Sequence, residues 1–347
     1  MKKLITVLAI LMVLVGCTQK DNTGEKRQLI ISTWGLSEDL LVSDVYGPFE
    51  EKFNVEIILE TGTTAERYTK LANDPNSTVD IIELSQKAAA DGYADGLFEK
   101  IDYTKVPNAS DLIEGAATLT KSGYGPAYTV NSIGIIFNPE TVGTDIKEWS
   151  DLWNTNLVNS IAIPDITTTF GPAMVAMASD VKGVDYTTDK GQTGFKALGE
   201  LKPNVVKTYS KSSDLAIMFA NGEIDAAIVG DFAYPVIKAA APTVEYLVPA
   251  SGTYANFNTL DINKNSKNKD LALEFINYRL GLELQTQNAS PETLNEAPTN
   301  AKVVLDEATA QFKTYGDVAS RAKALDYSVI NPLMSEWVDN YNRLMNQ

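Results

Sequence analysis

Short apolar runs alternate with amphipathic segments from Gln28 onward. Runs of four to eight apolar residues bounded by polar ones are typical of buried strands, and apolar residues at every third or fourth position are typical of helices. In the first third of the chain the predicted strands are 29–34, 54–59 and 80–84, and the predicted helices are 43–53, 64–72 and 87–92. This β-α-β-α-β order predicts a parallel, doubly wound sheet and an α/β fold class.

A second series of the same kind begins after the strand predicted at 132–139, which ends at an Asn-Pro pair that breaks regular structure. Its predicted strands are 160–164, 224–230 and 254–263, and its predicted helices are 149–153, 170–179, 214–220, 270–279 and roughly the last 45 residues. Two α/β lobes of similar size are therefore expected.

The amino terminus has the pattern of a secretory signal. Met1-Lys2-Lys3 is basic, and residues 4–15 are apolar apart from Thr6. This run is too short to cross a hydrocarbon core of ~30 Å. It ends in Leu14-Val15-Gly16-Cys17, which resembles the lipobox of bacterial lipoproteins.

The lipobox resemblance implies a signal peptide over 1–16, a lipidated Cys17 and a polar tether over 17–27. Two acyl chains are enough for stable anchoring, so the protein is expected on the extracytoplasmic face of a membrane that it does not span. The alternative is an ordinary signal peptide with a cysteine there by chance.

Composition excludes several kinds of chemistry. The chain of 347 residues has no histidine and one cysteine, and its formal net charge is −16. No Ser-His-Asp or Cys-His pair, no His-ligated zinc and no internal disulfide can form. An acidic chain is also a poor ligand for nucleic acid. We therefore expect no catalytic residues, no cofactor, no bound metal and no nucleic-acid partner.

Several motifs between Leu29 and the end of the chain resemble those of the spermidine/putrescine-binding family of ABC importer subunits, and they occur in the same order. The most specific is Trp149-Ser150-Asp151-Leu152-Trp153. The other motifs are Ile31–Trp34, Pro48–Phe53, Val79–Ser85, Gly96–Asp102, Ile133–Asn138, Phe219–Ile224, Ala272–Tyr278 and Ala297–Asn300.

This resemblance implies a type II periplasmic-binding-protein fold, in which two doubly wound sheets form two lobes with a ligand cleft between them. The implied lobes are residues 28–136 with 258–301, and residues 137–257 with 302–347. Such a protein is a monomer that closes on a small solute by a hinge and delivers it to a permease and its ATPase subunits, without doing chemistry.

The resemblance also implies a ligand site. Trp34 stands where the family has an aromatic wall, Ser85 where a serine bonds the ligand, and Asp165 where an acidic group anchors it. Each residue has a structural alternative: a core tryptophan, an N-cap of the following helix, and a cap of the helix after residue 166.

Other positions depart from the family pattern. Thr168 replaces a second carboxylate, Asn256 and Asn258 replace a tryptophan and an aspartate, Val229 replaces a tryptophan, and Lys87 replaces a tyrosine. The candidate ligand-binding residues are Trp34, Ser85, Asp165, Thr168, Asp231, Asn256, Asn258 and Glu296.

A polyamine needs carboxylates for its ammonium groups and aromatic faces along its methylenes. Asp165, Asp231 and Glu296 supply the carboxylates, and a polyamine is the leading ligand. A lysine such as Lys87 at the cleft instead favours an amino acid-like or phosphonate solute. Thiamine and ferric iron are further alternatives, the latter through Tyr124, Tyr128 or Tyr234.

Two different classes of protein stay open on the sequence alone. One is an extracellular lipoprotein enzyme that uses paired carboxylates, although neighbours such as Glu50 and Glu51 cannot face each other across a substrate. The other is an adhesin in which the cleft has no transport role.

Overall fold

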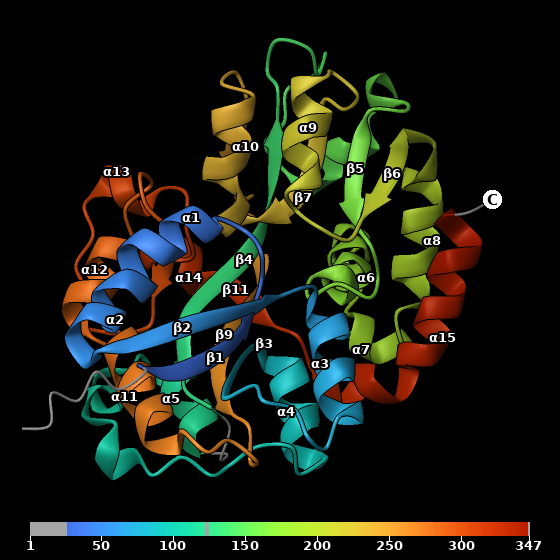
Figure 1. Cartoon of the computed structure of the whole chain (residues 1–347). Helices are drawn as coiled ribbons and strands as arrows, with labels where there is room; N and C mark the ends of the chain where they lie inside the picture. Colours follow the sequence, from blue (N-terminus) through green and yellow to red (C-terminus); the bar gives the residue numbers. More distant parts are fainter. Residues whose placement is uncertain (1–25, 122–124, 346–347) are drawn as a thin grey trace, which may run out of the picture.

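The computed structural model describes residues 26–121 and 125–345, and its strands form one mixed sheet (Figure 1). The hydrogen-bonded order is β2-β1-β3-β9-β4-β7-β5-β6, with β8 and β10 on β4 and β11 on β9. The strands are β1 (Arg27–Thr33), β2 (Val55–Thr61), β3 (Ile81–Ser85), β4 (Ala127–Phe137), β5 (Ile161–Pro164), β6 (Val205–Tyr209), β7 (Ala226–Gly230), β8 (Glu245–Leu247), β9 (Thr253–Ile262), β10 (Ala297–Pro298) and β11 (Ala322–Ala324).

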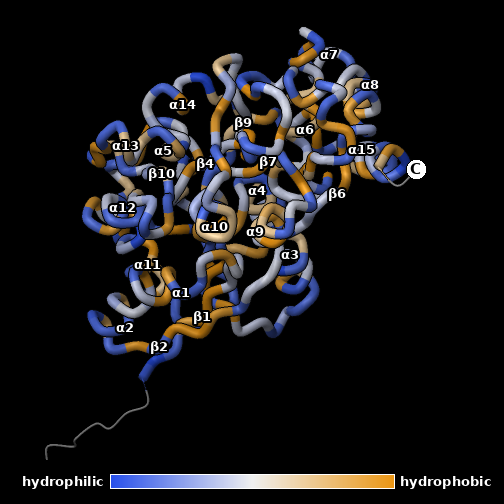
Figure 2. Tube along the Cα trace, turned by 90° about the horizontal axis from the view of Figure 1, so that it is seen from above, coloured by the Kyte–Doolittle hydropathy of each residue, from blue (hydrophilic) through white to orange (hydrophobic). Residues whose placement is uncertain are grey.

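Helices surround this sheet (Figure 1), and Figure 2 shows hydrophobic stretches along β1 and β2 and hydrophilic colouring around α12. The α-helices are α1 (Glu38–Leu41), α2 (Gly47–Phe53), α3 (Thr64–Asn73), α4 (Gln86–Ala94), α5 (Glu114–Lys121), α6 (Gly171–Val181), α7 (Tyr186–Asp189), α8 (Gln192–Leu201), α9 (Asp214–Ala220), α10 (Tyr234–Ala240), α11 (Lys269–Arg279), α12 (Leu282–Asn288), α13 (Glu307–Ala310), α14 (Gly316–Ser320) and α15 (Tyr327–Met345).

Most of the predicted elements are present, with the expected type and nearly the expected bounds. Two expectations need correction. The motif 149–153 forms a 3-10 helix, and the carboxy-terminal segment expected to be helical contains β11. The three residues of β11 join the sheet by pairing with β9, a partner about 70 positions away that local periodicity cannot reveal.

The sheet also differs from the two separate doubly wound sheets that were predicted. The pairings β1–β2, β1–β3, β5–β6 and β5–β7 are parallel as expected. β4 joins the two groups because its eleven residues are all buried and are long enough to serve different partners. Its first half pairs antiparallel with β9, and residues 133–137 pair with β7 and β8.

The buried apolar side chains divide along the chain at the middle of β4. One pair of clusters is drawn from residues 29–128 and 260–294, with Val79 and Leu84 among them. The other pair is drawn from residues 133–254 and from α15 at the carboxy terminus. A residue such as Phe49 therefore packs with the first group, and Trp337 with the second.

No helix in residues 26–121 and 125–345 is both long and apolar enough to cross a membrane. The predicted signal peptide, Cys17 and nearly all of the tether lie outside the described residues.

Gly134 in β4 tests how tightly the shared strand is packed. A Cβ there would lie 2.4 Å from the Tyr246 ring and 2.6 Å from the Leu247 carbonyl oxygen. We expect Gly134→Ala to lower the free energy of unfolding by about 1–3 kcal/mol in urea denaturation. The control is Gly199→Ala in α8, where the nearest atom is a Leu344 methyl at 3.5 Å. Removing a helical glycine there is expected to stabilise by about 0.5–1 kcal/mol. Equal effects would contradict the packing argument.

Candidate ligand site

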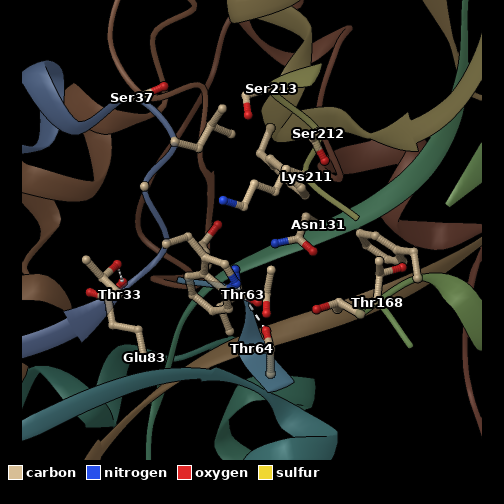
Figure 3. A pocket seen from close by; sticks show the side chains of 18 of the residues that line it. Thr33, Ser37, Thr63, Thr64, Glu83, Asn131, Thr168, Lys211, Ser212 and Ser213 are labelled. Carbon is tan, nitrogen blue, oxygen red and sulfur yellow. Dashed lines mark hydrogen bonds between the residues drawn. The ribbon is translucent and has the colours of Figure 1, made fainter. Parts of the chain in front are cut away.

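A cavity of about 600 Å³ opens where strands from both ends of the sheet terminate (Figure 3). Its wall includes residues directly after β1, β2, β6 and β7, the last residue of β5 with the loop 167–170, Glu83 of β3 and residues 128–131 of β4. The carboxyl ends of parallel strands are where α/β sheets bind ligands, because the loops there are free to vary. Residues 294–297 complete the wall.

The structure brings five of the eight predicted site residues to this cavity: Trp34, Thr168, Asp231, Asn258 and Glu296. Ser85, Asp165 and Asn256 lie one or two positions from lining residues in the sequence, but they do not line the cavity themselves. A role in ligand binding stays a prediction for all eight residues.

Trp34 is half-buried, and the one hydrogen-bond donor of its side chain already has a partner. Its indole Nε1 donates to Thr64 Oγ1 at 3.1 Å, and the Arg67 guanidinium lies 4.6 Å from the ring centroid. Arg67 is buried, with hydrogen bonds to the carbonyl oxygens of Gly62, Ser32 and Glu83. Trp34 therefore presents an apolar surface that is held in place from outside the cavity.

Asp165 closes a turn instead of reaching the cavity. Its Oδ1 accepts hydrogen bonds from the Thr167 backbone N–H at 2.9 Å and from Thr167 Oγ1 at 2.6 Å. α6 begins only at Gly171, so Asp165 is not its N-cap. Ser85 does occupy the N-cap position of α4, but its side chain makes no capping hydrogen bond.

Asn256 and Asn258 lie on the same side of β9 and bond each other, with Asn256 Nδ2 donating to Asn258 Oδ1 at 2.7 Å. Asn256 is buried, and its Oδ1 has no hydrogen-bond partner. Lys87, the lysine that would oppose a polycation, pairs with Asp91 on α4 and does not line the cavity.

Asp231 is a buried carboxylate at the end of β7. Its Oδ2 accepts from the Thr314 backbone N–H at 2.8 Å and from Thr314 Oγ1 at 2.6 Å, and its Oδ1 accepts from the Phe232 N–H at 2.9 Å. Burial raises the pKa of Asp231 to about 7, although these donors oppose the rise. Thr314 Oγ1 also lies 2.8 Å from Ser132 Oγ and can accept a hydrogen bond from it, which ties the carboxy-terminal segment to β4.

Glu296 is held by a cation beneath the cavity. Arg279 Nη2 lies 3.0 Å from Glu296 Oε1, and the same guanidinium stacks on the Tyr128 ring at 4.2 Å from the centroid. Arg279 is only 1% exposed. Burial raises the pKa of Glu296, and the Arg279 charge opposes that rise. Glu296 therefore has a fixed counter-ion that belongs to the protein.

Glu38, Glu66, Glu83 and Lys211 are charged lining residues that were not among the site residues predicted from the sequence. Glu83 is 1% exposed and accepts from Thr33 Oγ1 at 2.6 Å and from Tyr128 OH at 3.0 Å. Figure 3 shows Glu83 beside Thr33, and Lys211 with Ser212 and Ser213 in another part of the wall. Glu83 could have been noticed in the sequence, because a charged residue inside the apolar strand Asp80–Leu84 is unusual. Lys211 lies in a loop, where a lysine is common and indicates no ligand site.

The model of the family described as "Bacterial extracellular solute-binding protein" matches residues 45–319. The chain belongs to this family. The match spans both ends of the sheet and most of the residues that line the cavity, so the fold and the site belong to one family unit.

Individual relatives agree with this assignment. The "Spermidine/putrescine-binding periplasmic protein" of Salmonella typhimurium is 24% identical over 311 residues, which is 85% of this chain and 86% of that protein. The crystal structure of an ABC transporter from Clostridium perfringens ATCC 13124 is 54% identical, with a TM-score of 0.75 over 92% of this chain and 100% of the other. The PBP AgtB from A. tumefaciens R10 in complex with agropinic acid shares the fold, with 23% identity and a TM-score of 0.77 over 92% and 99% of the two chains.

As a member of this family the protein is the solute-binding component of an ABC transporter. It binds a small solute outside the cytoplasm and is not an enzyme. This confirms the family resemblance read from the motifs and sets aside the enzyme alternative. Among the residues that the structure describes, no group of three or more Asp, Glu, Cys or His side chains is placed to hold a metal ion.

The ion pair between Arg279 and Glu296 gives a stability prediction. Methionine at position 279 keeps an unbranched side chain but leaves Glu296 buried without its partner. We expect Arg279→Met to lower the free energy of unfolding by about 3–5 kcal/mol in urea denaturation. The control is Arg27→Met, which breaks an exposed pair with Asp270 and should cost at most about 1 kcal/mol. Similar losses in both variants would show that the buried pair is not special.

Asp231 gives a prediction for the pH dependence of stability. Its folded pKa of about 7 lies above the unfolded value of about 3.9, so the folded protein keeps a proton that the unfolded chain loses. The stabilisation from this proton is full below about pH 4 and is lost as the pH rises toward 7.

Asp231→Asn removes this titration. Relative to the variant, the wild type should therefore lose stability between pH 4 and pH 7, by up to about 1.4 kcal/mol per pH unit in denaturant titrations. The control is Asp145→Asn, which removes a carboxylate in an exposed pair with Lys147. A wild-type curve parallel to that of Asp231→Asn would refute the raised pKa.

Proposed function

We propose that the protein is a lipoprotein, anchored through Cys17, that captures a small amine in the cavity and delivers it to a permease and its ATPase subunits. The leading ligand class is a polyamine such as putrescine or spermidine. The observation that carries this proposal is the set of carboxylates on the cavity wall, which are Glu83, Asp231 and Glu296 together with the more exposed Glu38 and Glu66.

Capture by a hinge is supported by the way the cores divide. We propose that residues 28–136 with 258–301, and residues 137–257 with 302–347, form two lobes that close on the ligand as a monomer. The buried clusters change over near this boundary, between Tyr128 and Ile133 of β4, and the cavity wall draws on both groups. β4 and β9 run between the two groups, so a bend in these strands would change the cavity without unpacking either core. A ligand that contacts both walls favours the closed form.

A second ligand class has an observation of its own. Lys211 lines the cavity close to Ser212 and Ser213 (Figure 3), and an ammonium with neighbouring hydroxyls suits a carboxylate or phosphonate. An amine that carries an acidic group at its other end, such as an amino acid-like or aminophosphonate solute, would use both walls. The fold accepts such variation, because loops at the strand ends set the ligand.

Thermal unfolding with a ligand panel tests this function. We expect putrescine or spermidine at 100 times its dissociation constant to stabilise the protein by about 2.7 kcal/mol. The uncharged 1,4-butanediol has the length of putrescine without its charges and should cause no shift. A shift with 4-aminobutyrate or 2-aminoethylphosphonate, and none with the polyamines, would establish the second class instead. Stabilisation only by thiamine or a ferric chelate would refute capture of a simple amine.

A further inference from the structure

The carboxylates on the cavity wall differ in how far the protein already satisfies them. Glu296 has an ion-pair partner in Arg279, and both oxygens of Asp231 accept hydrogen bonds from Thr314 or Phe232. Glu66 accepts from the Thr63 N–H and Thr63 Oγ1 at 2.8 and 2.9 Å, within a capping box at the start of α3. These groups already have donors from the protein.

Glu83 has an unused oxygen. Its Oε2 accepts from Thr33 Oγ1 and Tyr128 OH, while Oε1 is buried with no hydrogen-bond partner. No lysine or arginine in the described part of the chain forms an ion pair with Glu83. A buried carboxylate oxygen without a donor costs free energy comparable to a lost charged hydrogen bond, so its position calls for a donor from outside the protein.

The neighbouring cations do not supply that donor. Arg279 pairs with Glu296, and Arg67 donates to backbone carbonyls. Arg67 Nη2 and Arg279 Nε have no hydrogen-bond partner, and neither donates to Glu83. Both guanidinium groups interact with the Glu83 charge electrostatically, which compensates the cost of burying it. The Arg279 guanidinium stacks on the Tyr128 ring, and the Tyr128 hydroxyl donates to Glu83. These contacts, together with Thr33, fix the position of the Glu83 carboxylate.

We propose that Glu83 is the anchor for the ammonium end of the ligand, whose N–H donates to the free Oε1. This inference rests on the proposed capture of an amine, but it applies equally to a polyamine and to an amine with an acidic tail. Trp34, held from behind by Arg67, then lies along the methylene chain that leads away from Glu83. The remainder of the ligand reaches the wall that contains Lys211 and decides the solute class.

A series of isosteric amines separates the anchor from the choice of solute. Butylamine, putrescine and 4-aminobutyrate share one ammonium end and differ only at the other. Dissociation constants are measured by isothermal titration calorimetry for the full folded chain, for Glu83→Gln and for the control Glu99→Gln. The glutamine at 83 keeps the shape and one acceptor oxygen for Thr33 and Tyr128, so a large change in folding is not expected.

We expect Glu83→Gln to weaken whichever amine the wild type binds by about tenfold to 100-fold, because a charge-assisted hydrogen bond is lost. Glu99→Gln changes a carboxylate that pairs with Lys269 and does not line the cavity, so it should change affinity by less than about threefold. Thermal unfolding without ligand checks that the Glu83→Gln protein is folded. If it is not, Glu83→Asp is used, which keeps the charge but withdraws it by one methylene and should weaken every bound amine of the series.

The outcomes distinguish the anchor from the proposed function. Amine binding that is unchanged in Glu83→Gln leaves solute capture standing and overturns the anchor. If the wild type binds 4-aminobutyrate but not putrescine, and Glu83→Gln weakens that binding, the ligand is not a polyamine but the anchoring role of Glu83 is supported. A wild type that binds none of the three amines overturns both.

Discussion

β4 is the constraint on which the rest of the structure depends. All of its residues are buried, and it pairs with β9 along its first half and with β7 and β8 along its second. β9 also contributes to both groups of clusters, through Tyr254 on one side and Leu260 on the other. Because backbone N–H and C=O groups inside a protein must be paired, β4 cannot leave either partner without exposing unpaired groups in the core. β4 therefore joins the two groups of buried clusters, and it cannot separate from either group without breaking buried backbone hydrogen bonds.

The cavity follows from this arrangement. Residues 128–131 lie on β4 just before it changes partners, and the carboxyl ends of the parallel strands on both sides meet there. Several buried charged side chains gather at the same place. Arg67, Arg279, Glu83 and Glu296 form a nearly neutral set beneath and along the wall. Mutual compensation lets these charges stay buried in a family whose task is recognition and not catalysis.

Solute binding also explains why the site is built mainly from groups that are already bonded. Trp34, Asp231 and Glu296 each have a partner within the protein, which fixes their positions before a ligand arrives. Preorganised groups lose little entropy on binding, so affinity then depends on the few atoms that remain unsatisfied. Glu83 Oε1 and Asn256 Oδ1 are two such atoms near the cavity.

The amino-acid sequence by itself determined the α/β class, most helices and strands, and the family, because these depend on local periodicity and on motifs that are contiguous in the chain. It placed Trp34, Thr168, Asp231, Asn258 and Glu296 at what the structure makes a cavity wall. The turn from Asp165 to Thr167 is local, because it joins residues two positions apart. Only the tertiary structure decided that Arg279 pairs with Glu296 and that Glu83 keeps an oxygen without a partner. The Glu83 contacts with Thr33 and Tyr128 join residues 50 and 45 positions apart, and no local pattern encodes such contacts.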